Sequence, residues 1–359
     1  MHIDVKQPMK ILHVVSSLNM GGAEQFVVDI TQAMNQQPLA HVDILSYGAP
    51  SDPLCQRCDA LNITVHHAPR QGRWQQCMQL RRLLKQYDVV HVHSSHCLLS
   101  VMMAAFFLPS QRLFYTRHNT VVHRSLKWRL VYRLASIKLS RIVFIADIAR
   151  QDFLQSYPAF QAKSTLIYNG IQPVNVARSK PTKNKTIRLG QVGRFVPLKA
   201  QTLLIQALQQ LSAEQREAFE LHFFGDGPLL DTCRQQAEPL QQDMAVTFHG
   251  LEMDKSRIYQ TIDVLVVTSE TEGLSLVMLE ALSAGCLVIA TKVGGNAEIV
   301  RHAESGLLFE YPDSAALSQI LQQLLVDTTW QGLATQGQEY FYAHFTQKQC
   351  VQSYLTHYD

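Results

Sequence analysis

Two glutamates separated by seven residues form the most informative pattern in this chain, because they flank a glycine turn and the start of a predicted helix. Glu272 follows an apolar run that ends at Ser269, and Glu280 lies inside a helix that we expect to begin near Ser275. Free amides of a helix's first turn, together with its dipole, favour an anion. The amides in question belong to Gly273, Leu274, Ser275, Leu276 and Val277. Since carboxylates accept hydrogen bonds from hydroxyls, the pattern predicts a site for a sugar nucleotide.

A short loop with two cations follows the first predicted strand of the second half of the chain. Arg194 and Lys199 bracket this loop, so both side chains can converge on one anion. The guanidinium offers a planar fork of donors, whereas the ammonium acts as a point charge. Taken alone, the two residues are equally consistent with surface ion pairs. Next to the anion-binding helix, they predict a site for a departing phosphate.

Two further turns place a pair of glycines between a strand and a helix. Gly21 and Gly22 follow the first strand, and Gly225 and Gly227 follow a strand in the second half. Glycine lets the backbone approach a ligand closely, and the next helix presents free amides to an anion. Neither turn has the third glycine of the dinucleotide fingerprint. A nicotinamide-dependent dehydrogenase therefore stays an alternative, and a phosphate-binding turn is the preferred interpretation.

Three histidines at positions 91, 93 and 96 resemble a metal-binding spacing. Strand alternation puts His91 and His93 on one face, but no acid or cysteine stands nearby to complete a ligand set. We therefore predict that this strand end lines a cleft. We predict no metal site in the chain, since no Asp-x-Asp pair ends a strand.

The elements that must position these residues are short β-branched runs that alternate with helical stretches. In the first half the runs occupy 10–15, 41–47, 63–68, 88–94, 112–118, 141–146 and 164–170. In the second half they occupy 187–193, 221–227, 246–250, 264–269, 287–291 and 306–309. Continuous apolar strands are buried on both faces, as in a parallel sheet covered by helices. The polar segment 171–186 interrupts the alternation, which predicts a linker between two doubly wound α/β domains.

Length and composition set outer limits on the class of protein. The chain has 359 residues, 47% of them hydrophobic, which is enough for two packed domains. A net charge of +3 is too balanced for a polybasic nucleic-acid binder, so we expect no nucleic-acid partner. No apolar run reaches the roughly 18 residues that span a bilayer. The first ten residues lack the apolar core of a signal peptide, which favours a cytoplasmic location.

These motifs together resemble the retaining glycosyltransferases of family 4, which have the GT-B fold. The resemblance covers nearly the whole chain, through GGAE, DVVHVHS, YTRHNT, IYNGI, VGRFVPLK, FGDGP, FHGL, the two spaced glutamates and VGGNAEIV. It implies two Rossmann-like domains facing across a cleft. The implied ranges are 1–175 for the acceptor-side domain, 176–335 for the nucleotide-sugar domain and 336–359 for a C-terminal helix that crosses back.

The resemblance also implies roles for individual residues of the second domain. Arg194 and Lys199 would bind the donor diphosphate, Glu280 the ribose hydroxyls, and Glu272 the transferring sugar. The backbone of Leu251, after the FHG segment, would meet the base. Gly225 and the amides from Gly273 onward would complete the donor site.

In the first domain, the resemblance implies that Gly21 and Gly22 bring backbone amides to the distal phosphate. It places His118, in YTRHNT, beside the sugar at the reaction centre. One departure is Leu274-Ser275, where many members carry Phe-Gly, which leaves the donor sugar open. Another is Leu287, where a proline is common, and which we interpret as structural.

The implied activity is hexosyl or N-acetylhexosaminyl transfer with retention, from a nucleotide sugar to a glycan or a lipid-linked glycan. UDP is preferred over GDP on family frequency, and the implied setting is bacterial polysaccharide or lipopolysaccharide synthesis. Two cations and a helix N-terminus would replace a metal at the leaving phosphate, so no cofactor is expected. A catalytically silent nucleotide-binding protein of the same fold is the second alternative.

Residues 117–141 contain seven Lys or Arg and no Asp or Glu. If 124–141 is one helix, Arg124, Lys127, Lys138 and Arg141 project within one sector, while the apolar residues form no single stripe. Trp128 lies near the edge of that sector. This basic face is either simply solvated or docks on an anionic lipid surface or a phosphate-bearing acceptor, with nucleic acid as the remaining alternative. Docking on a membrane would make the protein peripheral to it.

Overall fold

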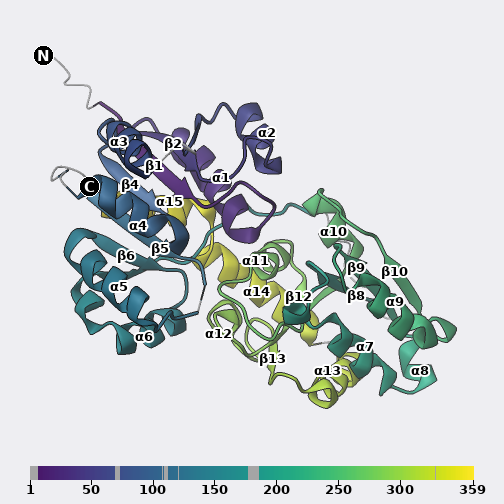
Figure 1. Cartoon of the computed structure of the whole chain (residues 1–359). Coiled ribbons are helices and arrows are strands. Elements are labelled where there is room, and N and C mark those ends of the chain that lie inside the picture. The colour runs from purple at the N-terminus through teal and green to yellow at the C-terminus, as the bar shows by residue number, and fades with distance from the viewer. Residues whose placement is uncertain are drawn as a thin grey trace, which may run out of the picture. The chain divides into compact units, whose positions relative to one another are not determined.

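Two separate parallel sheets organise the chain in this computed structural model, which describes residues 7–68, 73–106, 108, 112–119, 121–176, 186–327 and 329–359 (Figure 1). The N-terminal unit contains the chain up to Gly170 and also its last segment, Gln347–Asp359. The C-terminal unit is Ile171–Thr346. Each unit has a Rossmann-like α/β architecture, as the alternating pattern predicts.

The N-terminal sheet has seven strands in the order β3-β2-β1-β4-β5-β6-β7, and every neighbouring pair is parallel. Its strands are β1 (Met9–Val15), β2 (Ala40–Ser46), β3 (Val65–His67), β4 (Val89–Val92), β5 (Arg112–Arg117), β6 (Arg141–Phe144) and β7 (Ser164–Leu166). The strand order reverses between β1 and β4, so the chain leaves these two strands toward opposite sides. Ligands bind at such a switch point, beyond the carboxyl ends of the strands.

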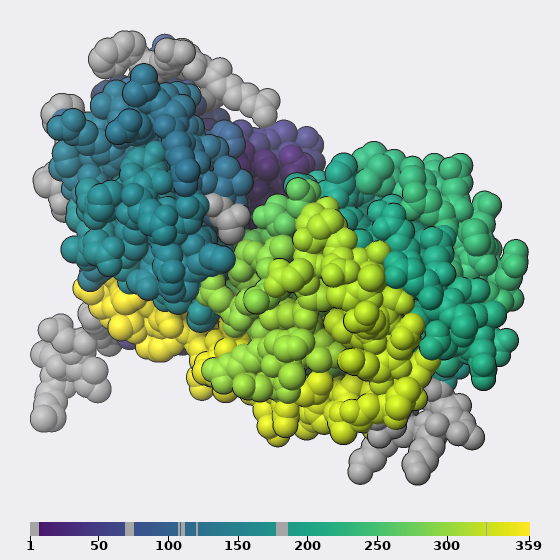
Figure 2. Space-filling model, turned by 90° about the horizontal axis from the view of Figure 1, so that it is seen from below, coloured from purple at the N-terminus to yellow at the C-terminus, as the bar shows by residue number. Residues whose placement is uncertain are grey.

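Helices cover this sheet and bury its β-branched side chains. They are α1 (Gly22–Asn35), α2 (Pro53–Ala60), α3 (Arg73–Leu84), α4 (Ser95–Ala105), α5 (Leu126–Lys138), α6 (Asp147–Ser156), the 3₁₀ helix η1 (Pro158–Lys163) and α15 (Gln347–Tyr358). In α1 the buried Phe26, Ile30 and Met34 recur every four residues, so one face packs inward. The last helix, α15, shown in yellow in Figure 2, buries Tyr354 and Tyr358 in the same unit.

The C-terminal sheet repeats this arrangement with six parallel strands in the order β10-β9-β8-β11-β12-β13. Its strands are β8 (Ile187–Val192), β9 (Phe219–Phe224), β10 (Ala245–Phe248), β11 (Val264–Val267), β12 (Leu287–Thr291) and β13 (Leu307–Phe309). Its helices are η2 (Pro197–Lys199), α7 (Gln201–Gln209), α8 (Ala213–Arg216), α9 (Leu230–Ala237), η3 (Glu238–Gln242), α10 (Lys255–Thr261), α11 (Leu276–Ser283), α12 (Asn296–Ile299), α13 (Ser314–Val326) and α14 (Trp330–His344). Here the order reverses between β8 and β11, whose ends carry the two motifs with charged residues.

The division of the chain differs in detail from the sequence-based ranges. The structure divides it after Gly170 and after Thr346, whereas the sequence-based ranges end at 175 and 335. The segment 336–359, predicted as one helix, contains the end of α14 and all of α15, with a break at Phe345 and Thr346. An isolated bridge pairs Ile171 with Thr346, so the two connecting segments run side by side where the units divide. Most of the predicted linker, 177–185, lies outside the described residues.

The basic segment is not the single helix that the sequence analysis assumed. Helix α5 ends at Lys138, so Arg124 precedes it and Arg141 begins β6. Trp128 stacks on His123 and Tyr132 instead of pointing outward beside the cations. The predicted basic sector is therefore wrong. Among the described residues, no helix is long and apolar enough to cross a membrane.

Candidate active site

An ion pair joins the two main sequence motifs of the C-terminal unit. Lys199 Nζ lies 2.5 Å from Glu272 Oε1, and Ser269 Oγ donates to the same carboxylate oxygen at 2.7 Å. Lys199 ends the 3₁₀ helix η2 after β8, and Ser269 follows β11. The predicted phosphate-binding lysine and the predicted sugar-binding glutamate are thus direct neighbours, and each fixes the other's side chain.

Buried polar side chains hold the backbone of the cationic loop. The Thr268 hydroxyl lies 2.9 Å from the carbonyl oxygen of Lys199 and 2.8 Å from that of Ala200, and it accepts from Gln191 Nε2 at 2.6 Å. Gln201 Nε2 donates to the carbonyl oxygen of Arg194 at 2.8 Å. Because these contacts fix the main chain at both ends of the loop, the two cationic side chains start from well-defined positions.

The Arg194 side chain is exposed, and no acidic residue in the described part of the chain forms an ion pair with it. This distinguishes it from Lys199, whose charge is already balanced by Glu272. A guanidinium without a carboxylate partner keeps its donors for a ligand. The loop therefore offers one fixed cation and one cation with its full donor capacity.

Glycines at the strand ends let the loops pack directly against one another. Gly225 has φ of +133°, and a Cβ atom there would lie 2.0 Å from the carbonyl oxygen of Gly193. Gly294 has φ of +50°, and a Cβ atom would lie 1.8 Å from the carbonyl oxygen of Glu272. Gly225 thus supports the cationic loop, and Gly294 supports the turn of Glu272. The second role was missed from the sequence, although the VGGN segment was noted as part of the family resemblance.

Glu280 is buried in α11 with both carboxylate oxygens engaged. Lys255 Nζ lies 2.7 Å from Oε1, and the Tyr259 hydroxyl donates to Oε2 at 2.7 Å. Burial, and then the negative charge of Glu280, raise the pKa of Tyr259 well above its usual value, so this hydroxyl stays a donor. Lys255 and Tyr259 were missed from the sequence. Their spacing of four on α10 was the available signal, since it places both on one face of a helix.

Helix α11 begins at Leu276, one residue after the predicted start, with Ser275 at its N-cap. The side chains of Leu274 and Ser275 are both buried, and Ser275 makes no capping bond. The carbonyl oxygen of Gly273 accepts from the amide of Gly295 at 3.0 Å. Leu251 is exposed directly after Gly250, whose carbonyl oxygen binds the amide of Gly225 at 2.7 Å. The predicted base-contacting residue therefore adjoins the glycine turn.

A pocket of about 320 Å³ opens in the N-terminal unit at the carboxyl ends of β1, β4 and β5. Its polar lining residues include Glu24, His93, Ser94, His96, His118 and Asn119. Gly21 is the N-cap of α1, and a Cβ atom there would lie 2.3 Å from Glu24 Oε2. Gly21 therefore lets Glu24 fold back over the start of the helix, next to the pocket.

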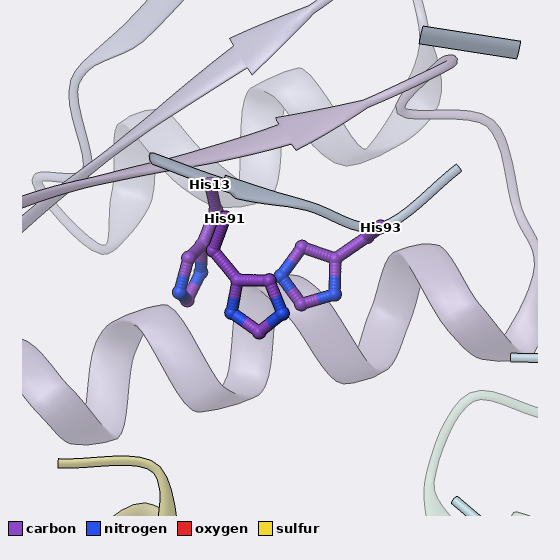
Figure 3. Close-up of side chains that lie close together, drawn as sticks. All are labelled: His13, His91 and His93. Carbon is purple, nitrogen blue, oxygen red and sulfur yellow. The ribbon is translucent and has the colours of Figure 1, made fainter. Parts of the chain in front are cut away.

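Three buried histidines gather behind this pocket. Figure 3 shows His13, His91 and His93 projecting from neighbouring strands to the same side of the sheet. One ring nitrogen of each lies within 4.8 Å of the others, and of the described residues only these form such a group. His13 was missed from the sequence, and His96 does not join the group. The predicted placement of His91 and His93 on one face is confirmed.

Hydrogen bonds between these histidines and their neighbours favour a polar cluster over a metal site. His91 bonds the Tyr358 hydroxyl through Nδ1 and lies 2.7 Å from Thr116 Oγ1 through Nε2. His13 Nδ1 lies 2.9 Å from Thr31 Oγ1. Tetrahedral zinc holds its nitrogen ligands about 3.4 Å apart, so the group would have to contract and His91 would have to lose a bond.

Burial keeps these imidazoles neutral. It lowers the pKa of His13 to about 3, with a smaller effect from the charge of His118. The pKa of His118 itself falls to about 4, and those of His91 and His93 lie well below the usual value, for the same reason. His93 Nδ1 and His118 Nε2 are 3.0 Å apart, which extends the cluster to the pocket wall. The pocket of the N-terminal unit is therefore polar but not cationic.

The structure thus brings the predicted site residues together within their own units. Arg194, Lys199, Gly225, Glu272 and Glu280 surround the carboxyl ends of β8, β9 and β11. Gly21, Gly22 and His118 lie at the corresponding edge of the N-terminal sheet. The fold and these residues define a class: α/β proteins of two units, the second of which has charged side chains at the carboxyl edge of its sheet.

Comparison with known proteins identifies the family. A model described as Glycosyltransferase Family 4 matches residues 20–174, and one described as Glycosyl transferases group 1 matches residues 175–339. The two matches adjoin and together cover residues 20–339, which include most of both units. The chain belongs to the glycosyltransferases of the GT-B fold.

Similar proteins of known name are also glycosyltransferases. The capsular polysaccharide biosynthesis glycosyltransferase CapH of Staphylococcus aureus is 24% identical over 307 residues, which cover 81% of this chain and 83% of CapH. A GDP-mannose-dependent phosphatidylinositol monomannoside mannosyltransferase of Mycobacterium tuberculosis is 27% identical over 276 residues, or 70% of each chain. The crystal structure of Anabaena HepE in complex with UDP superimposes with a TM-score of 0.85 at 22% identity, over 97% of this chain and 99% of HepE. At that identity the likeness shows the shared fold.

Proposed function

We propose that this glycosyltransferase moves a hexosyl or N-acetylhexosaminyl group from a UDP-sugar to a glycan or lipid-linked glycan, with retention of configuration and without a metal. The observation that carries the proposal is the Lys199–Glu272 pair, with the exposed Arg194 at the other end of the same loop. One residue of the pair suits a phosphate and the other suits a sugar hydroxyl. A ligand with both groups at adjacent positions is a sugar diphosphate.

Charge accounts for the chemical step. When the nucleoside diphosphate departs, negative charge grows on its phosphate oxygens while the sugar becomes positive. Lys199, whose side chain is fixed by Glu272, and Arg194, whose main chain is held by Gln201, are proposed to stabilise that charge more in the transition state than in the ground state. The first amides of α11 add to the same effect. Since these groups supply the positive charge, the proposed reaction needs no divalent ion.

Glu280 is proposed to hold the ribose. Its two oxygens are already fixed by Lys255 and Tyr259, so the remaining lone pairs point in defined directions. A carboxylate has about four lone-pair sites, which leaves room for two sugar hydroxyls. Leu251 is proposed to meet the base through its backbone, next to the turn of Gly225.

The pocket of the N-terminal unit is proposed to bind the acceptor and the transferring sugar. Its wall combines Glu24 with the neutral imidazole of His118. A neutral imidazole both donates and accepts, which suits hydroxyl groups better than anions. The amides that follow Gly21 and Gly22 are proposed to face the distal phosphate of the donor.

The choice of UDP is supported by the fold likeness to HepE, whose crystal structures hold UDP or UDP-glucose. The mannosyltransferase relative is GDP-mannose-dependent by name, so the base needs a direct test. We therefore expect UDP to raise the unfolding temperature more than GDP does, and NAD to leave it unchanged, because binding to the native state stabilises it by mass action.

A panel of UDP-sugars in the same assay identifies the donor, and the configuration of the product then reports the stereochemistry. Stabilisation by NAD alone would revive the dehydrogenase alternative. Nucleotide binding without transfer or donor hydrolysis would favour a silent binding protein.

A further inference from the structure

Helix α5 of the N-terminal unit has two apolar faces. One packs inward, through Val131, Tyr132 and Ala135. The other points outward and consists of Leu126, Leu130, Leu134 and Ile137, which are 81%, 60%, 44% and 77% exposed. At 100° per residue these four side chains fall within about 80° of one another, opposite the buried face. The inner face already serves the core, so the outer row has no role in packing this unit.

Cations border the outer row on both sides. Lys127 lies on one flank, Arg129 and Arg133 lie on the other, and all three are exposed. The helix has no acidic residue. Two further basic side chains are already engaged, since Arg124 pairs with Asp152 and Lys138 donates to the carbonyl oxygen of Leu108. The surface available to a partner is therefore the aliphatic row with its three flanking cations.

We propose that this surface of α5 docks in the headgroup region of an anionic bilayer, with the helix axis parallel to the membrane. A row of long aliphatic side chains between basic residues is the pattern of an interfacial helix. The cations match anionic headgroups, and the aliphatic chains enter the acyl boundary. The outer face has no acid and few directional hydrogen-bonding groups, which a specific protein interface would use. Figure 1 places α5 in the outer helical layer of the unit.

The test compares binding to vesicles made of equal parts phosphatidylglycerol and phosphatidylcholine with binding to phosphatidylcholine alone. The full chain should float with the anionic vesicles at low salt and much less with the neutral ones. Leu130→Asp combined with Ile137→Asp should lower partitioning into the vesicles by about a hundredfold or more, because two aliphatic side chains that would enter the bilayer are replaced by carboxylates. Arg129→Ala combined with Arg133→Ala should lower it by about thirtyfold, and added salt should remove that difference.

The control is Val326→Asp, which changes an even more exposed aliphatic residue of α13 in the other unit and should bind vesicles as the unchanged chain does. All variants should keep their unfolding temperature and their stabilisation by UDP, because the docking surface is independent of the proposed donor site. Failure to bind anionic vesicles at low salt would overturn the proposal. So would equal binding by the α5 variants, since the contact would then lie elsewhere.

Discussion

The two units have the same strand order around the switch point, but the side chains at the carboxyl edges of their sheets differ in charge. In the N-terminal unit the edge leads to buried, neutral imidazoles beside a polar pocket. In the C-terminal unit it holds charged pairs, Lys199 with Glu272 and Lys255 with Glu280. The likeness of the sheets therefore does not extend to the side chains at these edges.

We infer from this difference that the doubly wound sheet determines where a ligand binds, whereas the loop residues determine which ligand binds there. Fixed cations favour an anion, since it loses its hydration only where compensating charge is present. Neutral imidazoles favour hydroxyl groups. A donor with a diphosphate and an acceptor with hydroxyls match the two edges. Each experiment below tests one side of the comparison.

The largest effect is expected for Lys199→Ala. Turnover should fall by about 10²–10³-fold, because one preorganised charge facing the departing phosphate is removed. Lys292→Ala is the matched control, since Lys292 forms an exposed pair with Glu310 and should change turnover little. Steady-state rates with saturating donor measure both. Equal turnover in the two variants would show that Lys199 has no part in the chemical step.

The neutral histidines predict that acid destabilises the N-terminal unit first. The unfolded chain binds a proton at each histidine near pH 6.5, whereas folded His13 and His118 bind one only near pH 3 and 4. The free energy of unfolding therefore has its full value above about pH 6.5. Below that pH it falls by about 1.4 kcal/mol per pH unit for each such histidine. Hydrogen exchange of β4 and β5, compared with β11 and β12, at neutral pH and near pH 5 reports the order of opening.

A variant sharpens this test. His13→Asn should flatten the pH dependence of unfolding whatever it does to stability at neutral pH, because one titrating group is gone. His67→Asn, at an exposed site, should leave the slope unchanged. The C-terminal unit also contains two histidines, His222 and His249, whose pKa values are lowered by burial. Earlier opening of β11 and β12 in acid would contradict the comparison.

A smaller effect is expected for Glu280→Gln. The dissociation constant of UDP should rise about tenfold while turnover at saturating donor changes little, because ribose contacts are made equally in the ground and transition states. Calorimetric titration and steady-state kinetics separate the two quantities. Lost turnover with unchanged UDP affinity would place Glu280 at the reacting sugar instead.

The smallest effect is expected for removal of metal ions. Activity should persist after treatment with EDTA, since two cations and a helix N-terminus supply the positive charge that a divalent ion would otherwise provide. The same protein with added magnesium or manganese is the comparison. Activity lost on chelation and restored by either ion would reveal a metal requirement that the described residues do not suggest.

Much of the fold was predictable because buried parallel strands leave a strong apolar pattern. All thirteen strands of the described residues overlap runs identified in the sequence, and α11 begins one residue after its predicted start. The apolar pattern does not predict which face of helix α5 is buried. Its inner and outer faces are both apolar, so the residues formed no single stripe in projection. Only the packed structure shows which face is covered.

The sequence by itself determined the alternation of strands and helices, the glycine turns, and the charged motifs at strand ends, because each depends on residues close together in the chain. Tertiary structure decided what depends on distant segments. It joined Lys199 to Glu272 and Lys255 and Tyr259 to Glu280, and it brought His13 to His91. No local pattern encodes such contacts, since they follow from the order and register of strands far apart in the sequence.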